Sequence, residues 1–130
     1  MKILIDTRAV FLSVSEPEKL SIHGKRSLSH TGAEIFVSMI SCAEIACAVD
    51  RGTIALDRHW KIWFRNYIEL NGWRIVPIDL EIMEEAYSLP EYLHRNPADR
   101  IIVATARKHH LSIVTADRRM LDYPHVETIW

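Results

Sequence analysis

Four acidic residues in this sequence, Asp6, Glu44, Asp99 and Asp117, have the types and positions to bind a divalent metal ion together. Each is predicted to lie at the carboxyl end of a strand or in the first turn of a helix. If the strands are parallel, such positions converge on one edge of a sheet. Carboxylate oxygens suit hard ions such as Mg²⁺ or Mn²⁺, and ions held in this way support hydrolysis of a phosphodiester by activated water.

Four carboxylates that lie close together repel each other. The repulsion is about 1 kcal/mol per pair at 4 Å in water and about 4 kcal/mol at an effective dielectric constant of 20. Bound cations would offset it, and helix amino termini would ease it in part. No side-chain nucleophile is evident in the sequence, and metal-assisted hydrolysis requires none.

Asp99 belongs to the clearest helix start in the chain. Asn96 can cap this helix, and Pro97 suits its first position, where the missing N–H has no partner to lose. Asp6 follows the β-branched segment 2–5, and Asp117 lies just beyond the predicted strand 111–115. Asp6 has a purely structural alternative, because it can cap the helix predicted to start at residue 8.

Glu44 has a second interpretation that needs no metal. Ser41 and Glu44 match the capping-box pattern, in which Ser is the N-cap and Glu, three residues later, bonds back to its backbone. Taken alone, this pattern favours the structural role. Hydroxyls raise a similar question: Thr7 and Thr115 could bond to a carboxylate or a water at the acidic edge, or only satisfy backbone groups at strand ends.

Three arginines, Arg8, Arg95 and Arg100, flank the acids in the sequence. Each could contact phosphates, or could pair with an acid and separate it from the others. Trp60 and Phe64 recur at helical spacing in a predicted helix, 56–70, with further aromatic residues beside them. Most of this aromatic stripe should be core. As a further hypothesis, the face formed by Trp60, Trp63, Phe64 and Tyr67 borders a partner groove, with Trp60 and Phe64 as contacts to RNA or a partner protein.

The remaining pattern alternates between strands and helices, as in an α/β fold. Further strands are predicted at 33–38, 73–78 and 126–130, and further helices at 41–49 and 80–88, the latter capped by Asp79. The polar region 15–32 should hold one short amphipathic helix. The two cysteines and seven histidines show no metal-ligand spacing, so most histidines are expected at the surface.

Composition fits one globular domain spanning residues 1–130, with 48% hydrophobic and 25% charged residues. No apolar segment approaches the ~20 residues of a membrane span, and the apolar run before Asp6 is too short for a signal peptide, so we expect a cytoplasmic protein. The net charge of −1 argues against a constitutive nucleic-acid coat protein. It permits a nuclease that holds cations in an acidic pocket.

Four segments of the chain resemble, in family order, the acidic motifs of PIN-domain nucleases and, more narrowly, of VapC-type toxins from bacterial toxin–antitoxin pairs. They are Ile3-Leu4-Ile5-Asp6-Thr7, Ser41-Cys42-Ala43-Glu44-Ile45, Asn96-Pro97-Ala98-Asp99-Arg100 and Val114-Thr115-Ala116-Asp117. The resemblance implies a PIN-like α/β/α sandwich with a mostly parallel central sheet.

It also implies a ribonuclease that depends on Mg²⁺ or Mn²⁺, with Asp6, Glu44, Asp99 and Asp117 as metal-binding acids and Thr115 beside the last of them. Such proteins usually form homodimers, and a cognate antitoxin blocks them by laying its tail, often with an arginine, beside the acidic pocket.

The chain departs from the family pattern at two positions. Many relatives carry His or Asn where this chain has Arg8, and many have Asp where it has Asn96. Two alternatives to a toxin remain open: an RNA-processing PIN nuclease without an antitoxin, and an inactive binding module, which should have lost at least one acid. A flavodoxin-like nucleotide binder would need a Gly-rich phosphate loop, and none is present.

Overall fold

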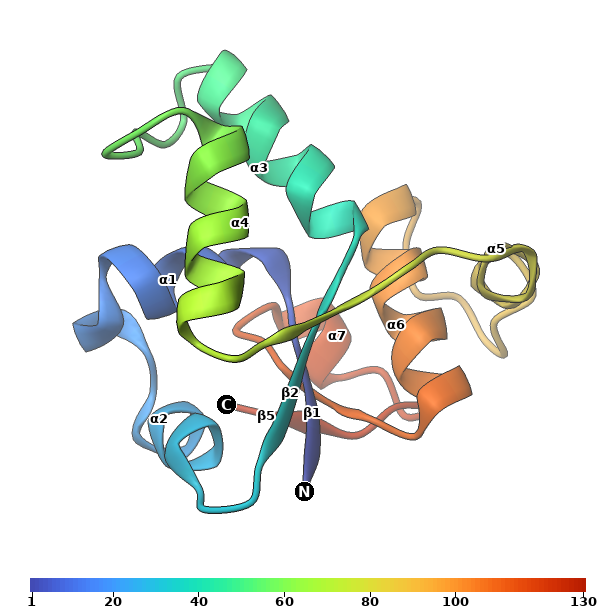
Figure 1. The fold of residues 1–130 in the computed structure, drawn as a ribbon. Coiled ribbons are helices and arrows are strands. Elements are labelled where there is room, and N and C mark those ends of the chain that lie inside the picture. The colour runs from blue at the N-terminus through green and yellow to red at the C-terminus, as the bar shows by residue number, and fades with distance from the viewer.

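The computed structural model describes all 130 residues and contains one five-stranded sheet with helices on both faces (Figure 1). The strand order is β3-β2-β1-β4-β5, and every neighbouring pair is parallel. The predicted α/β class is therefore confirmed, and the sheet is parallel throughout rather than mostly so. The strands are β1 Lys2–Ile5, β2 Glu34–Ser38, β3 Arg74–Val76, β4 Ser112–Val114 and β5 Thr128–Ile129.

Helices connect the successive strands, as parallel pairing requires. None of them has the length and apolar character that crossing a membrane would take. Between β1 and β2 lie two helices and a short 3₁₀ turn. The polar region 15–32, which was expected to hold one short helix, holds one helix and the 3₁₀ turn. The helices are α1 Thr7–Ser15, α2 Ile22–Ser29, α3 Ile40–Asp50, α4 Trp60–Leu70, α5 Leu80–Ala86, α6 Pro97–His109 and α7 Arg118–Leu121, and the 3₁₀ turn is Pro17–Lys19.

The central strand β1 faces both halves of the core. Ile3 and Ile5 point to one face, where they pack in a cluster with Trp63 of α4 and residues of α1 and α3. Leu4 points to the other face, where it packs with Ile102 of α6 and residues of α7. In Figure 1, α1 and α4 lie on one side of the sheet and α5 and α6 on the other. The molecule is thus the expected α/β/α sandwich.

The strand order brings two carboxyl ends together at the centre of the sheet. After β1 the chain builds β2 and β3 on one side, and it then returns to add β4 on the opposite side of β1. Ile5 and Val114 are register partners, and the Asp6 N–H donates to the carbonyl of Val114 at 3.1 Å. This reversal of strand order is where open α/β sheets form ligand sites.

The predicted capping box at the start of α3 is wrong. The helix begins at Ile40, its N-cap residue Met39 makes no side-chain cap, and Ser41 lies inside the helix. The hydroxyl of Ser38, the last residue of β2, accepts the Ile40 N–H at 3.2 Å instead. Because the chain turns into α3 directly from the strand, Glu44 falls in the second helical turn and has no capping role.

Two other predicted helices are shorter in the structure. The helix expected from residue 56 begins at Trp60, where the His59 ring caps it by accepting the Lys61 N–H at 3.2 Å. Leu56 packs against the core from a segment that is not helical, so its apolar side chain extended the periodic pattern without extending the helix. The helix expected to reach residue 88 ends at Ala86.

Trp63 should be one of the most costly residues to truncate, because it is 1% exposed and packs beside Ile3 and Ile5 in the core under the sheet. We predict that Trp63→Ala lowers the free energy of unfolding by about 3–5 kcal/mol in urea denaturation. Ile62→Ala on the same helix is the control, since Ile62 is 59% exposed and its change should stay within about 0.5 kcal/mol. Equal effects of the two substitutions would contradict this packing.

Candidate metal and nuclease site

All four predicted acids line one cavity of about 680 Å³ at the carboxyl edge of the sheet. Asp6 follows β1, Asp117 follows β4, and Asp99 and Glu44 come from the helices α6 and α3. From the acids the cavity continues between α1 and α3 toward residues 53–55. A second cavity of about 730 Å³, beside α5 and α6, contains none of these acids.

Thr115 forms hydrogen bonds with both Asp6 and Asp117. Its hydroxyl donates to Oδ2 of Asp6 and accepts the backbone N–H of Asp117 at 3.0 Å. The other oxygen of Asp6 accepts the Ala9 N–H at 2.8 Å, so Asp6 also caps α1. Asp6 can therefore cap α1 and still offer a carboxylate oxygen to the cavity. The Thr115 hydroxyl contacts a carboxylate, which is one of the two roles predicted for it from the sequence.

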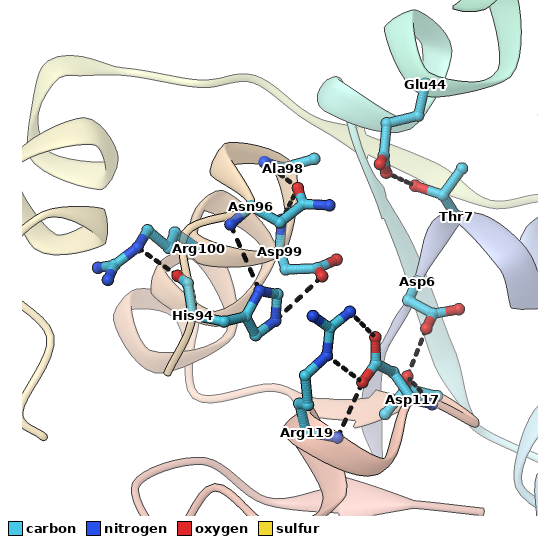
Figure 2. Close-up of polar contacts among 11 residues, drawn as sticks. Asp6, Thr7, Glu44, His94, Asn96, Ala98, Asp99, Arg100, Asp117 and Arg119 are labelled. Atoms are coloured by element: carbon cyan, nitrogen blue, oxygen red, sulfur yellow. Dashed lines mark hydrogen bonds and ion pairs between the residues drawn. The ribbon is translucent and has the colours of Figure 1, made fainter. Parts of the chain in front are cut away.

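Glu44 is held by a hydroxyl from the other side of the cavity. Thr7 Oγ1 donates to Oε1 of Glu44 (Figure 2). The same oxygen lies 2.9 Å from the hydroxyl of Ser41. Ser41 is fully buried and comes from the helix that carries Glu44. Ser41 and Glu44 thus both contact the Thr7 hydroxyl, and neither caps the start of the helix.

Asp99 lies in the first turn of α6, as predicted. Asn96 caps this helix, because its side-chain oxygen accepts the N–H groups of Ala98 and Asp99 at 2.9 and 3.3 Å. On the far side of Asp99 lies His94, whose Nε2 is 3.2 Å from Oδ2 of Asp99. His94 is 7% exposed, so the expectation that most histidines lie at the surface missed it. No sequence spacing distinguishes His94 from the other histidines. The fold of the segment just before α6 places its ring beside Asp99.

Burial and mutual repulsion make two of the acids weak. Burial, with the charges of Asp117 and Glu44, raises the pKa of Asp6 from 3.8 to about 6, against the hydrogen bonds from Thr115 and the Ala9 N–H. Burial and the charges of Glu44, Asp117 and Asp6 raise the pKa of Asp99 from 3.8 to about 7. The pKa values of Asp6 and Asp99 therefore both respond to the charges of neighbouring acids, which is the expected consequence of placing carboxylates at one edge.

Arg119 is the cation that sequence reasoning missed. Its backbone N–H donates to Asp117 at 2.8 Å, and its guanidinium lies 3.4 Å from the same carboxylate. Partial burial alone would raise the pKa of Asp117, but the hydrogen bonds and positive charge of Arg119 outweigh it and leave that pKa below 3.8. The position of Arg119, two residues after Asp117 at the start of a short helix, is the signal that could have indicated it.

The three arginines singled out in the sequence have different surroundings. Arg8 is exposed and lines the cavity, whereas Arg95 is exposed outside it. Arg100 donates through Nε to the carbonyl of His94 at 2.7 Å and through Nη1 to that of Ala86 at 3.1 Å. None of the three forms an ion pair with an acid of the site, so the role of separating the acids falls to Arg119 instead.

The aromatic residues of α4 belong mainly to the core. Phe64 is 4% exposed, and Trp60 is half-buried against the same cluster. Neither lines the acidic cavity. A buried Phe64 cannot present its ring to RNA or a partner in this conformation, because the helix turns it toward the sheet, so that part of the sequence expectation is wrong.

The donor set at this edge fits a divalent cation. It consists of carboxylate oxygens from Asp6, Glu44, Asp99 and Asp117, and hard ions such as Mg²⁺ and Mn²⁺ prefer such ligands. The raised pKa values of Asp6 and Asp99 provide a second indication. Two buried carboxyls that ionise with difficulty are the arrangement that a cation would stabilise most.

We predict that the metal-free protein loses stability as the pH rises from 4 to 8. The folded pKa values of Asp6 and Asp99, about 6 and about 7, exceed the ordinary value of 3.8, so in this window the folded chain binds more protons than the unfolded chain. Stability must then fall with rising pH. Urea denaturation in chelator at several pH values measures the slope.

Asp99→Asn should flatten this slope and raise the free energy of unfolding at pH 8 by ~1 kcal/mol or more, since a shift of one pKa unit corresponds to about 1.4 kcal/mol. Asp122→Asn is the control, because Asp122 is exposed and lies outside the cavity. A wild-type slope in the Asp99 variant would contradict the repulsion described above.

Comparison with known proteins agrees with this geometry. The family model described as PIN domain matches residues 3–126. The chain is 31% identical to "Ribonuclease VapC22" of Mycobacterium tuberculosis, over 98% of each protein.

Two solved structures share the fold. The "Toxin-antitoxin complex from Klebsiella pneumoniae" aligns with a TM-score of 0.65 at 22% identity, over 95% of this chain and 94% of that one. A second is VapBC2 of Rickettsia felis bound to a DNA fragment from its promoter. It aligns with a TM-score of 0.70 at 16% identity, over 98% of this chain and 97% of that one. The match to the family model, over nearly the whole chain and all four acidic segments, shows that this protein belongs to the PIN domain family.

Proposed function

We propose that this protein is an endoribonuclease that depends on Mg²⁺ or Mn²⁺ and acts as the toxin of a toxin–antitoxin pair. The observation that carries the proposal is the group of four carboxylates in one cavity, two of them with pKa values raised to about 6 and about 7. The relative named as a ribonuclease, 31% identical over 98% of both proteins, supports the activity.

The residues at the sheet edge have separable roles in this proposal. Asp6, Asp99 and Asp117 hold the cation from β1, α6 and the end of β4, and Glu44 faces them from α3. A divalent cation bound there lowers the pKa of a water and offsets charge on the phosphate under attack. Thr7 and Thr115 donate their hydroxyl protons to carboxylates and so orient Glu44 and Asp6, and metal-assisted hydrolysis requires no side-chain nucleophile. Water is therefore the attacking group.

RNA would approach through the cations around the cavity. Arg8, Arg51 and Arg119 line it, and guanidinium groups bind phosphate well. The whole chain has a net charge of −1, so attraction to a polyanion must come from this local arrangement. A cytoplasmic location, where RNA substrates are available, is part of the same proposal.

The same cavity suits the tail of an antitoxin. Beyond the acids its walls include the apolar side chains of Phe11, Leu12 and Ile54. A peptide with apolar residues followed by a cationic one would contact these walls and reach the carboxylates. The structural neighbour from Klebsiella pneumoniae is a toxin–antitoxin complex, which supports a partner of this kind. Assembly as a homodimer is part of the same proposal.

The direct test is cleavage of a mixed RNA pool by the purified protein with Mg²⁺ or Mn²⁺, and again with chelator. We expect cleavage only with metal, and a loss of at least about 100-fold in rate for Asp99→Asn and Asp6→Asn, because each removes a charge from the cation site. Asp122→Asn again serves as the control and should cleave like the wild type.

The outcomes separate the alternatives. Cleavage at the wild-type rate by either site variant would remove that residue from the proposed site. Failure of every protein to cut, with the fold intact, would favour an inactive binding module. The lack of a neighbouring gene for a small antitoxin-like protein, or cleavage that continues in the presence of such a gene's product, would favour an RNA-processing nuclease.

Arg8 provides a test of the substrate path. We predict that Arg8→Ala raises KM for RNA about three- to tenfold with little change in kcat, and that it weakens the salt dependence of binding, because one phosphate contact is lost. Arg26→Ala, an exposed cation on α2 outside the cavity, is the matched control. Equal KM values for the two variants would show that Arg8 does not contact the substrate.

A further inference from the structure

His94 is a buried imidazole at the rim of the acidic group, and one of its ring nitrogens is unsatisfied. The residue is 7% exposed, and its Nε2 makes no hydrogen bond of good geometry. A buried polar atom without a partner is costly, and native proteins rarely keep one without a reason. The nearest acceptor is Oδ2 of Asp99, at 3.2 Å from Nε2.

The backbone determines which ring nitrogen carries the proton. The Asn96 N–H donates to Nδ1 of His94 at 3.3 Å, so Nδ1 presents its lone pair. In the neutral ring the proton is then on Nε2, the nitrogen that faces Asp99. Figure 2 shows both contacts, with the ring between the backbone of Asn96 and the carboxylate of Asp99.

The loop that carries His94 is itself held firmly to α6. Arg100 Nε donates to the carbonyl of His94 at 2.7 Å, and the guanidinium of Arg100 lies over the rings of Tyr87 and Tyr92. Because Asn96 also caps α6, the imidazole and Asp99 are built on opposite sides of one rigid helix start. Their relative position is set by contacts from the Arg100 and Asn96 side chains to the backbone of this segment.

We propose that His94 is a positioning residue for Asp99. In the form of the site that binds the cation, the Nε2–H of His94 donates to one carboxylate oxygen of Asp99, and the other oxygen of Asp99 faces the acidic pocket. This inference rests on the proposed metal-dependent activity and deepens it. The separation of 3.2 Å is already within hydrogen-bond reach, so a small rotation of the carboxylate completes the bond. The free oxygen of Asp99 lies on the side toward Asp6 and Glu44 in Figure 2.

A competing interpretation makes His94 a metal ligand. Ligand atoms of His94, Asp99 and Asp117 lie within 4.8 Å of one another, which would suit a site with one nitrogen. Coordination through Nε2, however, moves the proton of the neutral ring to Nδ1, where it would face the Asn96 N–H. Metal-bound histidines normally donate their second N–H to an acceptor, and here that nitrogen meets a donor. The contact with Asn96 therefore favours the positioning role.

The tautomer can be observed directly by long-range ¹H–¹⁵N NMR of the histidine rings, with His94 assigned by the signal that His94→Gln removes. We expect the Nε2–H tautomer for His94 in chelator, and the same tautomer after addition of Mg²⁺, which is diamagnetic. A ring protonated on Nδ1, or one that changes to that form with Mg²⁺, would overturn the proposal in favour of coordination.

A matched pair of variants tests the consequence for the metal site. Gln can place an N–H donor near the position of Nε2, whereas Leu has a similar size and no donor. In titrations of Mg²⁺ followed by calorimetry, His94→Leu should bind about tenfold more weakly than the wild type, the size expected for one hydrogen bond to a charged group. His94→Gln should bind within about threefold of the wild type.

Each result of the titration decides between positioning and mere packing. Wild-type affinity in His94→Leu, or an equal loss in the Gln and Leu variants, would overturn the role of the donor. The tautomer measurement uses the wild-type protein, so it decides the question even if the Leu variant fails to fold. Failure of the wild type to bind either Mg²⁺ or Mn²⁺ would overturn the proposed function itself, whereas normal binding with the wrong tautomer would overturn only the role of His94.

Discussion

Repulsion among four carboxylates at one edge of the sheet is the constraint on which the rest of this structure depends. Burial adds to it, and together they raise the pKa values of Asp6 and Asp99 to about 6 and about 7. Such an arrangement lowers the stability of the empty protein at neutral pH, so folding must be secured elsewhere. The parallel sheet and its two apolar layers provide that stability, with side chains such as Ile3 and Leu4 fully buried on opposite faces.

The acids are held apart and oriented by a small set of neutral donors and one cation. Thr115 bonds to Asp6, Thr7 bonds to Glu44, and Arg119 pairs with Asp117. Asp99 is the exception, since its only close polar neighbour is the imidazole of His94. Hydroxyls and a neutral ring orient a carboxylate without cancelling its charge, so the group stays attractive to a cation. Salt bridges to all four acids would have cancelled the negative charge that attracts a cation.

Local sequence signals correctly predicted helix starts that depend on a capping residue and its immediate neighbours. Asn96 with Pro97 correctly predicted the start of α6, and Asp79 correctly predicted the cap of α5. The capping box of Ser41 and Glu44 failed for a tertiary reason: the turn out of β2 starts the helix at Ile40, before the expected cap. The aromatic stripe of α4 was placed correctly on a helix, but only packing showed that Phe64 points into the core.

By itself, the sequence determined the α/β class, the order of the strands and helices, and the placement of the four acids at one edge of the sheet. Short-range sequence patterns mark strand ends and helix starts, and the acids lie at or near these positions. Only the tertiary structure decided which groups surround those acids. Thr115 bonds to Asp6, 109 residues away in the sequence, because the chain reverses its strand order and pairs β4 with β1. Thr7 bonds to Glu44, 37 residues away, because β1 and β2 are neighbours in the same sheet. Contacts between such distant segments depend on the whole packed sheet, and no local pattern records them.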